Sequence, residues 1–166
     1  MAALIASRVG MHVIPGLPRE DAAKLWELSA DDRGDVAVVS LRGELDFLGA
    51  SVLQACLSGI RWRARARSVV DLAGLAFLDC ACLGVLVRHC KEVRSRGGSF
   101  ALAGPQPAVR LVLSATGLLT WFEVHDTFGE AVADASARRS GPACAPSARS
   151  HGTAVVTARD LYQESR

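Results

Sequence analysis

The sequence predicts an α/β fold in which helices cover a mixed β-sheet. Short apolar runs rich in β-branched residues recur along the chain, and stretches with apolar residues at helical spacing separate them. Gly, Pro or polar residues stand at most of the junctions. Strands that alternate with helices favour a parallel or mixed sheet. With 166 residues, 50% of them apolar, the chain has the length of one domain and enough material for a core.

The patterned part of the chain begins with an expected hairpin. Residues 24–28 and 36–41 are predicted strands, and the polar stretch 30–35 between them is a predicted turn. Residues 43–46, Gly-Glu-Leu-Asp, are expected to end the second strand.

Helices and strands then alternate to the end of the pattern. Pro107 suits the first turn of a helix, Gly97-Gly98 and Gly117 suit helix ends, and Thr127 with Glu130 has the spacing of a capping box. The expected order is helix 48–58, strand 69–72, helix 83–93, strand 99–103, helix 107–116, strand 122–124 and helix 131–137.

The two ends of the chain are expected to be tails of a single domain. Residues 1–22 form a predicted N-terminal arm, 23–137 the folded domain, and 138–166 a flexible C-terminal tail with a short patterned stretch at 153–162. No apolar run has the roughly 18 residues that span a bilayer, and no secretory signal pattern is present. We therefore expect a cytoplasmic protein without membrane contact.

Charge and motifs exclude several classes of function. A net charge of +2 gives no reason to expect direct binding of nucleic acid, and we interpret the alternating arginines of 61–67 as a solvated connector, not as a nucleic-acid patch. The five cysteines are an odd count for a disulfide framework, and their spacing predicts no metal site. Without a nucleophile elbow, dinucleotide loop or phosphate loop, we expect neither an enzyme nor a cofactor.

Two stretches carry a resemblance to a known family. Residues 36–46, VAVVSLRGELD, and the run from Leu72 to Val132 resemble the STAS domain of anti-sigma factor antagonists, over roughly residues 24–136. The resemblance implies a STAS-like mixed sheet that binds an anti-sigma factor, a serine kinase of the GHKL type, and so frees a sigma factor. It also implies a bacterial origin. The preference for Arg over Lys indicates a GC-rich genome, as in actinobacteria.

The resemblance further implies a phosphorylation switch at the start of the second helix. There the family reads Asp-Ser-Ser/Thr-Gly-Leu-Gly, and this chain reads Asp79-Cys80-Ala81-Cys82-Leu83-Gly84. Ala81 stands at the phosphoacceptor position and has no hydroxyl. We therefore expect either an antagonist that phosphorylation cannot switch off, or a sensory or scaffold STAS module that binds a small ligand or other STAS proteins, with weak self-association.

On the same helix, Ala81, Gly84, Val85 and Arg88 recur at spacings of three and four residues, beside the stripe that is expected to be buried. We predict that these residues form a docking surface for a protein partner. The alternative is that the small residues Ala81 and Gly84 only allow the helix to pack tightly on the sheet. Asp46 is expected near Asp79 from the resemblance, although an isolated Asp at this place most often caps a helix. Cys80 and Cys82, at a helix N-terminus, could also form a redox sensor. The predicted partner-binding residues are Asp46, Asp79, Cys80, Ala81, Cys82, Gly84, Val85 and Arg88.

Overall fold

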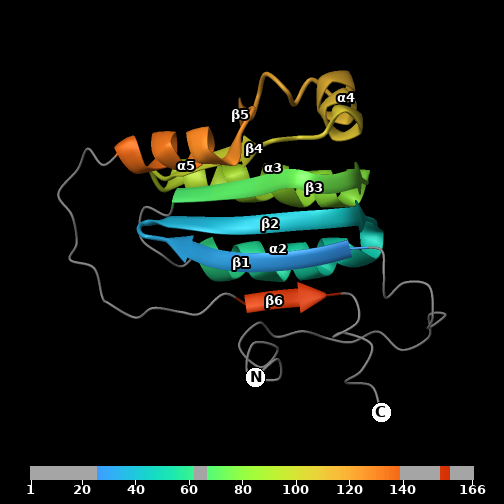
Figure 1. Cartoon of the computed structure of the whole chain (residues 1–166), viewed down its shortest axis with the longest axis horizontal. Helices are drawn as coiled ribbons and strands as arrows, with labels where there is room; N and C mark the ends of the chain where they lie inside the picture. The colour runs from blue at the N-terminus through green and yellow to red at the C-terminus, as the bar shows by residue number, and fades with distance from the viewer. Residues whose placement is uncertain (1–25, 62–66, 139–153, 158–166) are drawn as a thin grey trace, which may run out of the picture.

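A six-stranded mixed sheet with the strand order β5-β4-β3-β2-β1-β6 forms the centre of the molecule. The computed structural model describes residues 26–61, 67–138 and 154–157 (Figure 1). Its elements are β1 (Trp26–Arg33), β2 (Val36–Leu45), α2 (Phe47–Arg61), β3 (Arg67–Leu78), α3 (Cys80–Ser95), β4 (Ser99–Ala103), α4 (Pro107–Ala115), β5 (Glu123–His125), α5 (Phe128–Ala137) and β6 (Ala154–Thr157). This arrangement confirms the predicted fold class.

Helices cover both faces of the sheet. Strands β2 to β5 are parallel, whereas β1 runs antiparallel to β2. Figure 1 shows α2 and α3 on one side of the sheet and α5 on the other. Alternate residues point to opposite faces: Ala37 and Val39 join the main core with α2 and α3, whereas Val36 and Val38 pack with α5. The continuous apolar run of β2 is what a strand buried on both faces requires.

The hairpin is longer than predicted. Asp31 and Asp32 belong to β1, and the turn is confined to Gly34 and Asp35, with Arg33 opposite Val36. Gly34 has a φ of 66°, the left-handed conformation that a two-residue hairpin turn requires and glycine supplies. The charged pair that suggested a turn therefore lies in the strand.

The second strand also extends beyond its predicted end. β2 continues to Leu45, where the sequence suggested a break at 43–46. Gly43, with a φ of 82°, lies next to one of two register shifts in the pairing with β3. Such an irregularity bends a strand locally without ending it, and glycine tolerates it.

Some later elements agree with their sequence signals, whereas β3 (Arg67–Leu78) extends well beyond the predicted 69–72 and α5 begins at Phe128, before the predicted 131. β4 spans the predicted residues, and α4 begins at Pro107. The capping box forms: Glu130 N–H donates to Thr127 Oγ1, and Thr127 N–H donates to Glu130 Oε2, both at 3.3 Å. α3 begins three residues earlier than the apolar pattern indicated, directly after Asp79.

The expected C-terminal tail contains a strand. Residues 154–157, within the patterned stretch, form β6, which pairs antiparallel with β1 from Ala30↔Ala154 to Glu27↔Thr157. The predicted N-terminal arm lies outside the described residues. None of the helices in the described ranges has the length and apolarity to cross a bilayer.

The capping box gives the first testable prediction. Thr127→Ala removes the oxygen that accepts the Glu130 N–H, so the free energy of unfolding should fall by about 1 kcal/mol in urea denaturation. Thr127→Ser keeps this acceptor and is the matched control. Equal stability of the alanine and serine variants would contradict the assignment.

Candidate functional site

The carboxyl ends of two neighbouring parallel strands position the candidate site. β2 ends at Leu45 and β3 ends at Leu78, and these two residues are partners in the pairing. Asp46 and Asp79 follow them directly, and the N–H of Asp79 donates to the carbonyl of Leu45 at 3.1 Å. The expectation that the two aspartates lie together is therefore confirmed.

Each aspartate caps the helix that follows it. The Asp46 carboxylate accepts the N–H groups of Leu48 and Gly49 at 3.1 and 3.2 Å, at the start of α2. The Asp79 carboxylate accepts the N–H of Cys82 at 2.9 Å, at the start of α3. Carboxylates at these places accept hydrogen bonds from backbone N–H groups that have no partner within the helix. Their negative charge also interacts favourably with the positive end of the helix dipole. Asp46 therefore caps a helix, which was the alternative role expected for it, and it also lies close to Asp79.

The Cys82 thiol joins the two loops. Its Sγ donates to the backbone carbonyl of Asp46 at 3.1 Å, from a fully buried position. This contact fixes the N-terminus of α3 against the start of α2. Farther along the same helices, Arg88 Nη1 donates to Gln54 Oε1 at 3.4 Å.

Four predicted partner-binding residues form an accessible surface on α3. Cys80, Ala81, Gly84 and Arg88 are exposed. Their spacing of three and four residues places Ala81, Gly84 and Arg88 on one stripe. We call Cys80, Ala81, Gly84 and Arg88 the α3 surface.

Two other predicted partner-binding residues are corrected. Cys82 is 0% exposed and Val85 is 7% exposed, and both belong to the main core. Because α3 contacts both the sheet and α2, its buried face is wider than one stripe. Cys82 and Val85 support the α3 surface from below and are not accessible on it.

Two aromatic residues at this edge were missed in the sequence. Phe47 and Phe77 are 63% and 49% exposed, and together with Leu111 they are the exposed large hydrophobic side chains of the described part of the chain. Phe47 follows Asp46 directly, and Phe77 stands two residues before Asp79. Because side chains alternate along a strand, Phe77 points to the sheet face opposite to that of Leu78, which belongs to the core with α2 and α3. Phe47, at the start of α2, is therefore the exposed aromatic residue on the side of the α3 surface, and such a residue near small ones is typical of a protein-docking site. The signal in the sequence was their position beside the two aspartates.

The space around Gly84 distinguishes the two explanations for the small residues on α3, partner docking and tight packing on the sheet. A Cβ built at Gly84 would meet no atom within 4 Å, so the fold itself does not need glycine there. The interpretation that small residues allow tight packing on the sheet is therefore wrong for Gly84. Glycine within a helix costs roughly 1 kcal/mol relative to alanine, so the chain gives up stability at this exposed position.

Burial changes the expected chemistry of Cys82. Desolvation raises the pKa of the Cys82 thiol to about 12, and the charges of Asp79 and Asp46 act in the same direction. The helix N-terminus, which favours a thiolate, is outweighed by these effects. A redox role for Cys82 therefore loses its chemical basis, whereas Cys80 remains an exposed thiol.

A second cluster of polar side chains lies at the other end of the sheet order. The side chains of Glu123, His125 and Asp134 offer ligand atoms within 4.8 Å of one another. Arg138 donates to both carboxylates, at 2.9 Å to Asp134. A hydrogen bond with Glu123 and the charge of Arg138 lower the pKa of Asp134. Because the guanidinium already compensates the carboxylates, we interpret this cluster as an ion-pair network that joins β5 to α5.

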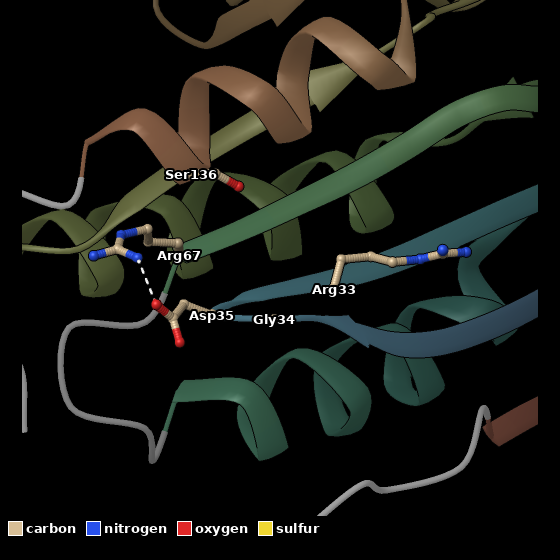
Figure 2. Close-up of a pocket in the computed structure, with 5 residues that line it drawn as sticks. All are labelled: Arg33, Gly34, Asp35, Arg67 and Ser136. Atoms are coloured by element: carbon tan, nitrogen blue, oxygen red, sulfur yellow. Dashed lines mark ion pairs between the residues drawn. The ribbon is translucent and has the colours of Figure 1, made fainter. Parts of the chain in front are cut away.

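A hollow of about 260 Å³ lies beside the hairpin turn, at the amino ends of the parallel strands. Figure 2 shows Arg67 and Asp35 pointing toward each other, as an ion pair at 3.6 Å, while the Arg33 side chain extends away from them. Gly34 and Ser136 complete its lining. The two arginines thus do not converge on one ligand position.

The geometry defines a class of protein. The surface at the starts of α2 and α3 consists of two capped helix N-termini, small exposed residues and the exposed ring of Phe47, which suits docking of another protein. The STAS domain model matches residues 27–131, and this chain belongs to that family.

Related proteins carry names that agree with this class. The anti-sigma F factor antagonist of Paenibacillus polymyxa is 27% identical over 101 residues, which cover 60% of this chain and 86% of that protein. An anti-sigma factor antagonist from Mycobacterium paratuberculosis superposes with a TM-score of 0.63 at 24% identity, over 72% of this chain and 99% of that one. The unphosphorylated anti-sigma factor antagonist SpoIIAA superposes with a TM-score of 0.60 at 23% identity, over 66% and 96%. SpoIIAA, a Bacillus cell fate determinant, also has a structure in its phosphorylated form.

The contrast between two thiols at the start of α3 is testable. With a pKa raised to about 12, Cys82 stays protonated near pH 8, where we expect iodoacetamide to alkylate the exposed Cys80 but not Cys82 in the folded protein. Peptide mass spectrometry reads out both sites. Cys56, whose pKa is also raised to about 12 by burial, is the matched control. Labelling of Cys82 as fast as Cys80 would contradict the buried, hydrogen-bonded thiol.

Proposed function

We propose that this protein is a cytoplasmic anti-sigma factor antagonist. It binds an anti-sigma factor of the GHKL serine-kinase type and so frees a sigma factor for transcription. The docking surface consists of the α3 surface together with Asp46, Asp79 and Phe47. The relatives named above, which are anti-sigma factor antagonists, support this role.

The observation that carries the proposal is the open space at Gly84. An exposed glycine that nothing in the chain requires leaves room for the close approach of a partner backbone. Beside it, Ala81 is also small and exposed, and Phe47 adds an apolar ring at the start of the adjacent helix. Small residues beside an aromatic ring allow shape complementarity without a large electric field, in agreement with the net charge of +2.

The antagonist is proposed to lack the phosphorylation switch. A phosphate brings roughly −1.5 to −2 charges, and at position 81 it would lie on the first turn of α3, beside the Asp79 cap. A partner that fits the surface without this added charge would be repelled. Ala81 has no hydroxyl to accept the phosphate, so the docking surface gains no phosphate charge and the antagonist stays competent to bind.

A sensory or scaffold STAS module is the second candidate. The same alanine favours it, because a module that no kinase controls can serve assembly or ligand binding. A retained apolar ligand, or a complex with other STAS proteins in place of an anti-sigma factor, would distinguish it from the antagonist. Pull-down with the full chain from the native host, followed by identification of the captured proteins, separates the two candidates.

Gly84→Leu tests the docking surface. The side chain fills the open space, so it should abolish capture of the anti-sigma factor while the free energy of unfolding stays equal or rises by up to about 0.8 kcal/mol. Gly59→Leu is the matched control, since Gly59 is also an exposed helical glycine at which an added Cβ would meet no atom within 4 Å, but it lies near the far end of α2. Binding that survives Gly84→Leu, or is lost equally in the control, would contradict the proposed surface.

Ala81→Ser tests the missing switch. The new hydroxyl lies on the exposed first turn of α3, so the captured kinase should phosphorylate this variant and leave the natural chain unlabelled. Ala133→Ser, at an exposed position of α5, should also stay unlabelled and is the control. Phosphate that the kinase incorporates into any Ser or Thr of the natural chain, or an Ala81→Ser variant that stays unlabelled, would contradict a switch-free antagonist.

A further inference from the structure

The outer edge of β1 is covered by a segment from outside the family domain. The STAS match ends at residue 131, whereas β6 comprises residues 154–157 and pairs with β1. Without β6, β1 would be the edge strand of a five-stranded sheet. Edge strands present unpaired N–H and C=O groups to which another chain can add a strand.

The two halves of β1 differ in how this edge is protected. β6 pairs with Glu27 to Ala30, and the remaining residues of the strand are Trp26 at its start and Asp31, Asp32 and Arg33 at its end. Charged residues on an edge discourage strand addition. The strand pairing therefore covers the half of β1 with less charge, which contains the buried Leu28 and the partly buried Ala30.

We propose that β6 is a strand cap that prevents β1 from pairing with β1 of a second copy of this chain. Both partners need the same outward N–H and C=O groups of Glu27–Ala30. A copy of the molecule can therefore bind its own β6 or the neighbouring β1 at these residues, but not both. Release of β6 opens a self-association surface that does not involve the α3 surface.

A second copy can pair with this edge because the two ends of β1 carry opposite charges at positions that would face each other. In an antiparallel pairing centred on Ala30, Glu27 of each copy lies opposite Arg33 of the other, which forms two opposite-charge pairs. Residues opposite each other then share a face, so the helices of both copies stay on corresponding sides of a continuous sheet. Leu28 meets Asp32 in this pairing, which keeps it weak enough for a four-residue cap to suppress it.

The first experiment removes the cap in the full-length protein. In an antiparallel pair only every second residue of a strand directs its N–H group at a given neighbour, so either Val155 or Val156 donates to β1. Proline has no N–H group, so Val155→Pro combined with Val156→Pro removes that donor in either case. Val155→Ala with Val156→Ala keeps both N–H groups and is the matched control. In sedimentation equilibrium we expect concentration-dependent dimers for the double-proline variant, and monomers for the control and the natural chain.

Hydrogen exchange shows whether the edge was opened. The outward amides of Glu27–Ala30 should exchange faster in the dilute double-proline variant, while the amides of β3 and α3 stay protected and show that the fold is intact. A double-proline variant that opens the edge yet remains monomeric at every concentration would overturn the proposal. Unchanged protection of these amides would also overturn it, because β6 would then not cover them.

Charge reversal tests the pairing itself. In the double-proline background, Glu27→Arg or Arg33→Glu alone places like charges opposite each other twice per dimer. Each should raise the dimer dissociation constant by about tenfold. Both reversals together restore the opposite-charge pairs and should restore the dimer. Dimers that are indifferent to all three changes would refute the pairing of β1 with β1.

Discussion

The parallel pairing of β2 with β3 is the constraint on which the candidate site depends. It aligns Leu45 with Leu78, so Asp46 and Asp79 leave the sheet side by side, and each begins a helix. The N–H of Asp79 and the thiol of Cys82 then bond to the backbone of residues 45 and 46. Because both helix N-termini are fixed to the same two strand ends, their relative position follows from the sheet and not from loop contacts.

Several exposed residues near the two helix N-termini lower the stability of the fold. Phe47 and Phe77 expose aromatic rings to water, and Gly84 places the poorest helix former after proline in an exposed helix. By contrast, the layer directly beneath is closed: Cys82 and Val85 are buried, and desolvation keeps the thiol protonated. An exposed apolar surface over a closed support is what a preformed docking site needs, since little ordering remains to be done on binding.

The two edges of the sheet are protected against pairing with another strand in different ways. At one edge β5 has only three residues, and its Glu123 is part of an ion-pair network with Asp134 of α5 and Arg138 at the end of that helix. At the other edge β1 has eight residues and needs the added strand β6. A short, charged edge discourages pairing by itself, whereas a long one has to be covered.

The sequence by itself determined the alternation of strands and helices and the capping box at Thr127, because these follow from local patterns. The meeting of Asp46 with Asp79 was expected only from the family resemblance, and the parallel pairing of β2 with β3 explains it. The resemblance, and not the residues alone, predicts that Ala81 stands at the phosphoacceptor position. Only the tertiary structure decided that Cys82 and Val85 are buried, that Gly84 faces open space, and that residues 154–157 join the sheet. Periodicity identifies one buried stripe on a helix, but burial depends on every element that packs there. Strand pairing across more than a hundred residues has no local signal, since its energy comes from backbone groups that all sequences share.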